Sequence, residues 1–402
     1  MPASTSVKAF LAGLKSQLTS QSAKSPIRFV TGNQSADMDS VISAISYSYF
    51  QFIFDPSITL VPLINIPRAD LSLRRDIVLL LKSHSITEDV LFFLEDLEEM
   101  SQNDRVIELV LVDHCNIQGE LLSKLSNEKR LKVISIIDHH ADEGVFLDSH
   151  PRIIQLNGSC SSLVFNYWFD QFNNREIFQN HELVQLLLGP LLVDTSNMTQ
   201  KVEENDTLSY KRYKGLLNLA EDPNKMNCLN KPDTKRDLDD FYKQLKKAKK
   251  DLEGFSFYDI LRKDYKQFSF INKSSRVNVG FSSLGKSIFW ISKNFKIDVI
   301  EKTLESIIND LNLDVIVITT SYTKKENDEY TREFVYYYKD AKFGSISELA
   351  KELELNNDIY HQDKLNEMKL INNLKIFNQA NIKASRKQVV PVVKNILETQ
   401  LA

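Results

Sequence analysis

The stretch VISIIDHH, from Val133 to His140, passes from a run of apolar residues directly into one acid and two histidines. Similar apolar runs occur elsewhere in the chain, at Ile27–Val30, Leu60–Ile64, Leu109–Val112 and Leu186–Val193. Because these runs do not alternate apolar and polar residues, they favour strands that are buried on both faces of a parallel sheet. Segments with helical periodicity, such as Ser40–Phe52 and Ser72–Lys82, would connect the strands. The pattern predicts an α/β fold.

Acidic clusters follow four of these runs. The clusters contain Asp37 and Asp39, Asp113-His114, Asp138-His139-His140, and Asp194. The carboxyl ends of parallel strands share one sheet edge, where buried carboxylates cost several kcal/mol each unless a cation compensates them. Oxygen ligands with one or two imidazoles suit Mg²⁺ or Mn²⁺, and the sequence has no thiolate pair that would indicate zinc. A single cluster would be better explained as a helix N-cap, but four in this order favour a metal site.

Composition sets limits on the architecture. The chain has 402 residues, 42% of them apolar, and only three cysteines, which favours two or three domains in a reducing compartment. Residues 1–230 hold 20 Lys and Arg against 29 Asp and Glu, and the remainder holds 30 against 25, so charges of −9 and +5 give the net −4. This split indicates a cation-binding half and an anion-binding half, or ordinary variation in surface charge.

The second half begins after a segment without apolar periodicity, between Asp222 and Asp237. A lysine-rich helix, Leu238–Leu252, and strands at Val277–Phe281 and Val315–Thr319 follow it. We therefore predict domains at residues 1–222 and 237–402, joined by a linker at 223–236. The run Lys243–Lys250 is read as a solvated helix face or, alternatively, as a polyanion contact.

The four acidic motifs together resemble those of the DHH phosphoesterase superfamily and, within it, the fungal-type cytosolic exopolyphosphatases. The resemblance rests on SADMDS, IPRADLSLRRD, GSCSSLVFNYW, LLVDTSNM, KDYKQF and SRKQVVP. It implies a parallel-sheet DHH domain and a smaller α/β DHH-associated domain, which family II inorganic pyrophosphatases also contain. It places the active site in the interdomain cleft.

The resemblance also implies roles for single residues and two divalent cations, Mg²⁺ or Mn²⁺. Asp37 and Asp39 would bind different cations, Asp113 would bridge both, and His139 and Asp194 would complete the second site. His140 would face the substrate phosphate, so Asp113 and His140 are the predicted catalytic residues. The predicted substrate-binding residues are Asn33, Lys266, Ser385, Arg386 and Lys387. Pyrophosphatases carry histidine at the position of Asn33.

Several motifs have two interpretations. His114 is a metal ligand or a residue that orients one. Arg68, Arg74 and Arg75 extend a basic track, or form ion pairs with Asp70 and Asp76. Gly158-Ser159 presents backbone N–H groups to phosphate, or forms a tight turn. Ser385 can simply begin a helix. Residues Gly280–Ser287 match the Walker A pattern letter for letter, but no apolar strand ending in Asp follows to hold Mg²⁺.

These observations predict an exopolyphosphatase that releases orthophosphate from the end of inorganic polyphosphate by a two-metal mechanism. The alternatives are an inorganic pyrophosphatase, a DHH-type oligonucleotide phosphodiesterase, and a protein that only binds polyphosphate. The resemblance suggests nucleoside tetraphosphates as further substrates. We expect a cytoplasmic monomer with no nucleic-acid or membrane partner. The acid-free N-terminus also fits mitochondrial targeting, although Phe10, Leu11, Leu14 and Leu18 predict an amphipathic helix.

Overall fold

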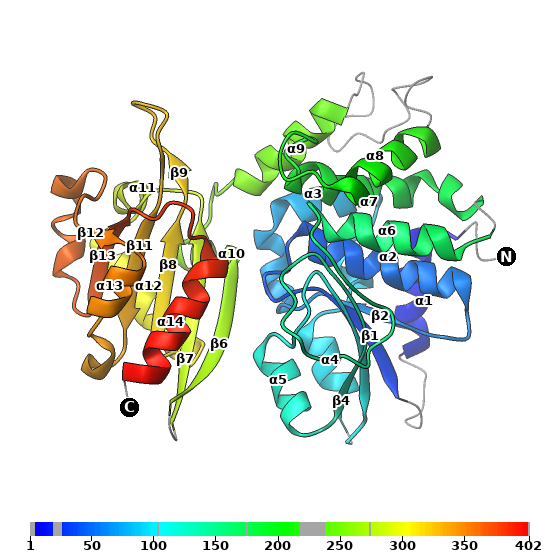
Figure 1. Ribbon diagram of the computed structural model, residues 1–402, viewed down its shortest axis with the longest axis horizontal. Coiled ribbons are helices and arrows are strands. Elements are labelled where there is room, and N and C mark those ends of the chain that lie inside the picture. The colour runs from blue at the N-terminus through cyan, green and yellow to red at the C-terminus, as the bar shows by residue number, and fades with distance from the viewer. Residues whose placement is uncertain are drawn as a thin grey trace. The chain divides into compact units, whose positions relative to one another are not determined.

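The computed structural model describes residues 5–18, 26–102, 104–173, 176–217, 238–272 and 275–400. The chain forms two compact units, Met1–Asp251 and Leu252–Ala402 (Figure 1). The predicted linker, 223–236, lies outside the described residues. The lysine-rich helix that we assigned to the second domain packs instead against α3 (Arg75–Ser83) and α7 (His181–Asp194) of the first unit. None of the described helices is both long and apolar enough to cross a bilayer.

The first unit contains a five-stranded, wholly parallel sheet in the order β2-β1-β3-β4-β5. Its strands are β1 Ile27–Thr31, β2 Val61–Leu63, β3 Ile107–Val112, β4 Leu131–Asp138 and β5 Arg152–Ile154. Four of the predicted apolar runs therefore form strands. The central strand β3 is almost entirely buried, as expected for a sheet covered on both faces.

Helices of the first unit cover this sheet, and α2, α6, α7 and α8 pack together as one layer (Figure 1). The α-helices are α1 Val7–Leu18, α2 Met38–Phe54, α3 Arg75–Ser83, α4 Leu94–Met100, α5 Glu120–Asn127, α6 Cys160–Gln171, α7 His181–Asp194, α8 Glu204–Leu216 and α9 Leu238–Lys250. Short 3-10 helices span η2 Arg68–Leu73, η3 Glu88–Val90 and η4 Glu176–Gln179. The predicted N-terminal helix is confirmed, since Phe10, Leu11 and Leu14 of α1 are buried.

The prediction of a strand at Leu186–Val193 is wrong, because these residues belong to helix α7. The run has only one β-branched residue, Val193, whereas Val133–Ile137 has four. Leucine favours helices, and β-branched residues favour strands. The Asn180 side chain caps the helix by accepting a hydrogen bond from Leu183 N. Asp194 therefore ends a helix and not a strand.

The second unit contains a six-stranded mixed sheet in the order β12-β13-β11-β8-β7-β6. Its strands are β6 Tyr265–Asn272, β7 Ser275–Leu284, β8 Val315–Thr320, β11 Glu333–Tyr338, β12 Leu355–Asn356 and β13 Leu374–Gln379, and β9 Tyr322–Thr323 pairs with β10 Tyr330–Thr331. The strands predicted at Val277–Phe281 and Val315–Thr319 are confirmed.

Both faces of the second sheet are buried. Along β8, Ile316 and Ile318 pack in one core, whereas Val315 and Val317 pack in another on the opposite face. Helices α10 Phe257–Lys263, α11 Ile288–Asn294 and α12 Ile297–Asp310 contribute to the first core, and α13 Ser347–Glu352 and α14 Arg386–Gln400 to the second. The 3-10 helices are η6 Ala341–Phe343, η7 Gln362–Leu365 and η8 Met368–Leu370.

Candidate metal centre and active site

The candidate site lies at the carboxyl ends of β1, β3 and β4, which are neighbours in the sheet of the first unit. Strand β1 leads into the loop that carries Asn33 and Asp37, β3 leads into Asp113, and β4 ends at Asp138. Asp113 has a left-handed backbone, with φ of 61°. Non-glycine residues rarely adopt this conformation, and where they do it is commonly at functional sites.

Asp113 is the centre of the cluster and is almost fully buried. Its Oδ2 accepts hydrogen bonds from Asn33 Nδ2 at 2.7 Å and Ser40 Oγ at 2.6 Å. Its Oδ1 lies 3.0 Å from His139 Nε2 and 3.7 Å from His140 Nδ1. Ligand atoms of Asp113, His139 and His140 all lie within 4.8 Å of one another, so these three side chains can share one cation.

Asp39 is held by the N-terminus of α6. Its carboxylate accepts hydrogen bonds from Cys160 N at 2.6 Å, Ser161 N at 2.8 Å and Ser159 Oγ at 2.8 Å. The partial positive charge of a helix N-terminus stabilises a carboxylate there. His139 Nε2 lies 3.9 Å from Asp39 Oδ2, which places Asp39 beside the Asp113 cluster.

Asp194 and Asp37 carry the remaining acidic charge. Burial raises the pKa of Asp194 to about 7; Lys249 opposes this rise, and Asp37 and Asp113 add to it. Asp194 Oδ2 is buried and has no hydrogen-bond partner in the described part of the chain. Asp37 caps α2 by accepting a hydrogen bond from Ser40 N at 3.1 Å. The interpretation of Asp37 as a helix cap is thus confirmed.

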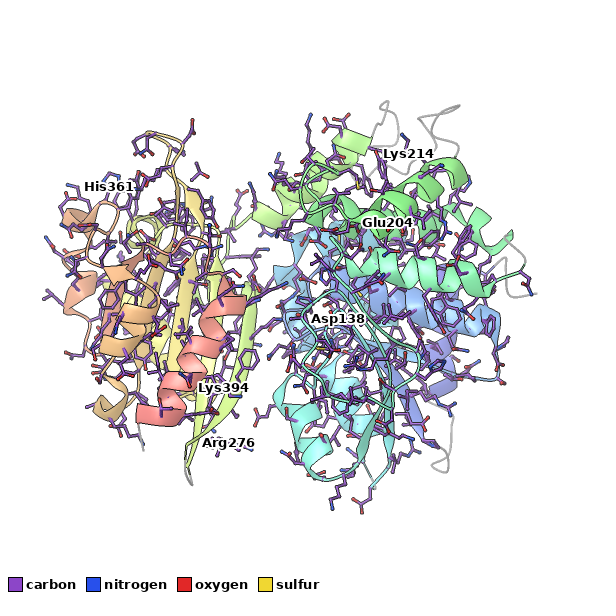
Figure 2. All side chains as sticks on the ribbon, viewed as in Figure 1. Asp138, Glu204, Lys214, Arg276, His361 and Lys394 are labelled. Carbon is purple, nitrogen blue, oxygen red and sulfur yellow. The ribbon has the colours of Figure 1, made fainter. Side chains whose placement is uncertain are left out.

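The two histidines of the DHH motif are each oriented through Nδ1. His139 Nδ1 lies 2.9 Å from the carbonyl oxygen of Asn157, and His140 Nδ1 lies 2.7 Å from Asp138 Oδ1. Asp138, labelled in Figure 2, is fully buried. Burial lowers the pKa of His139, but Asp113 and Asp39 raise it overall to about 10. Hydrogen bonds at Nδ1, like these two, fix the orientation of a metal-binding imidazole.

His114 takes no part in the Asp113–His139–His140 group. Its Nδ1 lies 2.9 Å from the carbonyl oxygen of Val112, and the side chain is buried.

The donor set fits a divalent cation. Asp39 is buried, and burial together with the charges of Asp113 and Asp194 raises its pKa well above the ordinary value. Carboxylates that repel one another in this way need a positive charge to stay ionised. Oxygen atoms dominate the set, with imidazole in addition, which suits Mg²⁺ or Mn²⁺.

Two alternative interpretations from the sequence are corrected in the first unit. The N–H groups of Gly158 and Ser159 are not available to bind phosphate, because they donate to Asp206 at 2.7 and 3.2 Å. Arg74 is not part of an exposed basic track, because it is buried and donates to the carbonyl oxygens of Ser35 and Ala36.

The other two arginines form ion pairs with acids that the sequence did not indicate. Arg68 pairs with Asp96 at 2.8 Å, and Arg75 pairs with Asp251.

The second unit brings the two predicted substrate-binding motifs together. Arg386, at the start of α14, donates from Nη2 to Asp264 Oδ1 at 2.8 Å and from Nη1 to the Asp264 carbonyl oxygen at 3.0 Å. Lys266 follows two residues later in β6, and Lys387 is exposed. Ser385 also serves the helix start, since its Oγ donates to Gln388 Oε1 at 2.8 Å.

The segment that matches Walker A is not a phosphate-binding loop. Strand β7 continues to Leu284, so five of the eight residues of the motif are extended strand. Ser287 caps α11, and Ile288 N donates to the buried carboxylate of Glu333 at 2.7 Å. An internal acid therefore occupies the helix N-terminus at which a P-loop would bind phosphate.

Sequence reasoning missed several residues that hold the cluster in place, among them Ser40, Asn157, Ser159 and Asp206. Ser40 lies inside the quoted SADMDS motif, so its position next to Asp39 was the available signal. No signal in the sequence marked Asp206, because it lies 48 residues from its partner Gly158.

Comparisons with known proteins find matches over most of the chain. Residues 28–190 match the model of the DHH family, N-terminal domain, and residues 243–396 match the DHHA2 domain. A Schizosaccharomyces pombe protein named "Putative exopolyphosphatase" is 33% identical over 372 residues, which cover 91% of this chain and 89% of that protein. Human "Exopolyphosphatase PRUNE1" is 26% identical over 92% of this chain and 76% of its own length.

Among solved structures, a Methanococcus jannaschii protein titled "putative family II inorganic pyrophosphatase" shares the fold. Its TM-score is 0.56 at 19% identity, and the match covers 92% of this chain and 99% of that one.

Proposed function

This chain belongs to the DHH family, and from that premise we propose that it hydrolyses the terminal phosphoanhydride bond of inorganic polyphosphate and releases orthophosphate. The observation that carries the proposal is the convergence of Asp39, Asp113 and Asp194 with His139 in one buried cluster. The relatives named as exopolyphosphatases support the choice of substrate.

The acidic cluster would hold two divalent cations, through Asp37, Asp39, Asp113, His139 and Asp194. When bound, such cations lower the pKa of water and neutralise charge on phosphoryl oxygens. Asn33 and Ser40 keep Asp113 in place by donating to its Oδ2.

His140 is the proposed proton donor to the leaving phosphate. Asp138 accepts a hydrogen bond from its Nδ1, so Nε2 is the nitrogen that exchanges a proton with the substrate.

Arg386, Lys387 and Lys266 are the proposed phosphate-binding groups of the second unit. Arginine offers a planar fork to phosphate oxygens, and lysine offers a compact charge. The Asp264 carboxylate holds the Arg386 guanidinium in position. Nucleoside tetraphosphates would present the same terminal groups.

A panel of pyrophosphate, tripolyphosphate and long-chain polyphosphate, assayed with Mg²⁺ and then Mn²⁺, tests the proposal. We expect orthophosphate release from tripolyphosphate and the long chain, and none from the Asp113→Asn variant. Cleavage of pyrophosphate alone would identify an inorganic pyrophosphatase instead. Faster hydrolysis of short oligonucleotides than of polyphosphate would identify a phosphodiesterase.

A further inference from the structure

We infer that Asp206, a residue of α8 outside the metal cluster, is a positioning residue that holds two of the predicted metal ligands in place. It acts through the segment Asn157–Ser161, which contacts both His139 and Asp39. The inference rests on the proposed function only in treating the acidic cluster as a cation site.

Asp206 is fully buried, and both of its carboxylate oxygens are occupied by neutral donors. Oδ1 accepts hydrogen bonds from Asn157 Nδ2 at 2.7 Å and Ser159 N at 3.2 Å. Oδ2 accepts from Gly158 N at 2.7 Å and from Glu203 N at 3.0 Å. The last bond closes the first turn of α8, whose course Glu204 and Lys214 mark in Figure 2. One carboxylate therefore ties three consecutive loop residues to a helix.

The same loop residues support the metal ligands on their other side. The carbonyl oxygen of Asn157 accepts a hydrogen bond from His139 Nδ1, at 2.9 Å. Ser159 Oγ donates to Asp39 Oδ1, and the next two N–H groups in the chain bind the Asp39 carboxylate. A displacement of the loop would thus move both His139 and Asp39.

Gly158 shows how closely the loop is packed against this support. A Cβ atom there would lie 2.5 Å from the Lys201 carbonyl oxygen, 2.7 Å from Asp206 Oδ2 and 2.7 Å from Thr195 Cγ2. Thr195 directly follows Asp194, so the loop also contacts the chain beside a third predicted ligand. Any side chain at Gly158 would therefore collide with this support.

Asparagine cannot replace Asp206 without displacing the loop. Both oxygens accept from N–H groups, so an amide NH₂ on either side would face a donor. Changes to residues that orient metal ligands typically weaken metal affinity about 10–100-fold. We expect the Asp206→Asn variant to bind Mn²⁺ within that range of weakening.

Glu333 of the second unit supplies the matched control. It is also a fully buried carboxylate that accepts from a helix N-terminal N–H group, that of Ile288, but it belongs to the other unit. Glu333→Gln should cost comparable stability and leave Mn²⁺ affinity unchanged. Asn157→Ala removes the Asp206 bond from the loop side and should weaken Mn²⁺ binding in the same direction, by a smaller factor.

Mn²⁺ affinity is measured for the four full-length proteins by titration calorimetry and by electron paramagnetic resonance, with folding checked by circular dichroism. Weaker binding in Asp206→Asn and Asn157→Ala, with Glu333→Gln like the wild type, supports the inference. Unchanged affinity in folded Asp206→Asn overturns it. Should that variant not fold, Asn157→Ala decides in the same way.

Failure of the inference can be told apart from failure of the proposed function. If the wild type binds Mn²⁺ and Asp206→Asn binds it equally well, only the positioning role is contradicted. A wild type that binds no Mn²⁺ contradicts the cation site itself, and with it both proposals.

Discussion

Both units of the molecule bury acidic side chains, but the first unit buries several close together, whereas Glu333 of the second is buried among neutral donors. Among the described residues of the second unit, Glu333 is the one buried acid, and it accepts hydrogen bonds from Ile288 N, Thr320 Oγ1 and Tyr322 OH. In the first unit, Asp39, Asp113 and Asp194 lie close enough to affect one another's ionisation, and Asp194 Oδ2 lacks a partner among the described residues. Neutral donors are sufficient for one buried acid. Several converging acids require cations.

The largest expected effect separates the two kinds of buried acid. Asp113→Asn should lower polyphosphate hydrolysis at least about 10³-fold, because it removes the negative charge of the central predicted cation ligand. Glu333→Gln should leave the turnover number within about threefold of wild type, since its partners are structural. The measurement is orthophosphate release under saturating Mg²⁺. Equal losses in the two variants would remove the distinction between the units.

A smaller effect distinguishes cation binding from phosphate binding. Arg386→Ala should raise KM for polyphosphate about 10–100-fold, because a hydrogen bond to a charged group is worth about 1.5–3 kcal/mol. Its Mn²⁺ affinity should equal that of the wild type, and Arg386→Lys should recover part of the KM loss. If Arg386→Ala instead altered Mn²⁺ affinity and left KM normal, the proposed role of Arg386 in phosphate binding would be contradicted.

Metal removal should destabilise the first unit. A ligand present at 100 times its Kd stabilises a protein by about 2.7 kcal/mol, so Mn²⁺ should raise the unfolding temperature measured after dialysis against a chelator. The increase should be smaller for Asp194→Asn and unchanged for Glu333→Gln. The same increase in all three proteins would mean that the ion binds elsewhere.

The last expected effect is a dependence of metal-free stability on pH. The pKa of Asp194 is raised to about 7, above its unfolded value, so the folded state binds more protons between about pH 4 and pH 7. The free energy of unfolding should therefore fall as pH rises through this range, by up to about 1.4 kcal/mol per pH unit for one such group. Urea denaturation in chelator at pH 5, 6, 7 and 8 measures it.

Asp194→Asn is the control for the pH effect, and it should flatten the slope near pH 7. A wild-type stability that rises from pH 5 to pH 7 would contradict the electrostatic description of the cluster. Adding Mn²⁺ should reduce the loss at high pH, because the metal binds the ionised carboxylates.

The sequence revealed the parts of the fold that local chemistry determines. Runs such as Val133–Ile137 form strands because four of five residues are β-branched. The leucine-rich run Leu186–Val193 gives the same apolar signal, but its side chains favour a helix. The strand prediction at Leu186–Val193 was wrong because it considered the length of the apolar run and not whether its side chains are β-branched.

The candidate site was predictable to a similar extent. The acidic motifs mark the ends of elements that the topology brings to one sheet edge, so Asp39, Asp113 and His139 could be expected together. Their supporting contacts could not, because residues such as Asp206 and Arg74 act across 39 to 49 positions of sequence with no motif of their own. Only the fold reveals which loop each of them holds.

Anomalous diffraction at the manganese edge, from crystals of the full-length protein grown with Mn²⁺, tests the central claim most directly. The account predicts peaks within coordination distance of the Asp113 carboxylate and His139 Nε2, with Asp37, Asp39 and Asp194 as further ligands. Crystals of folded protein that show no peak at this cluster, or manganese bound only at other residues, would contradict it.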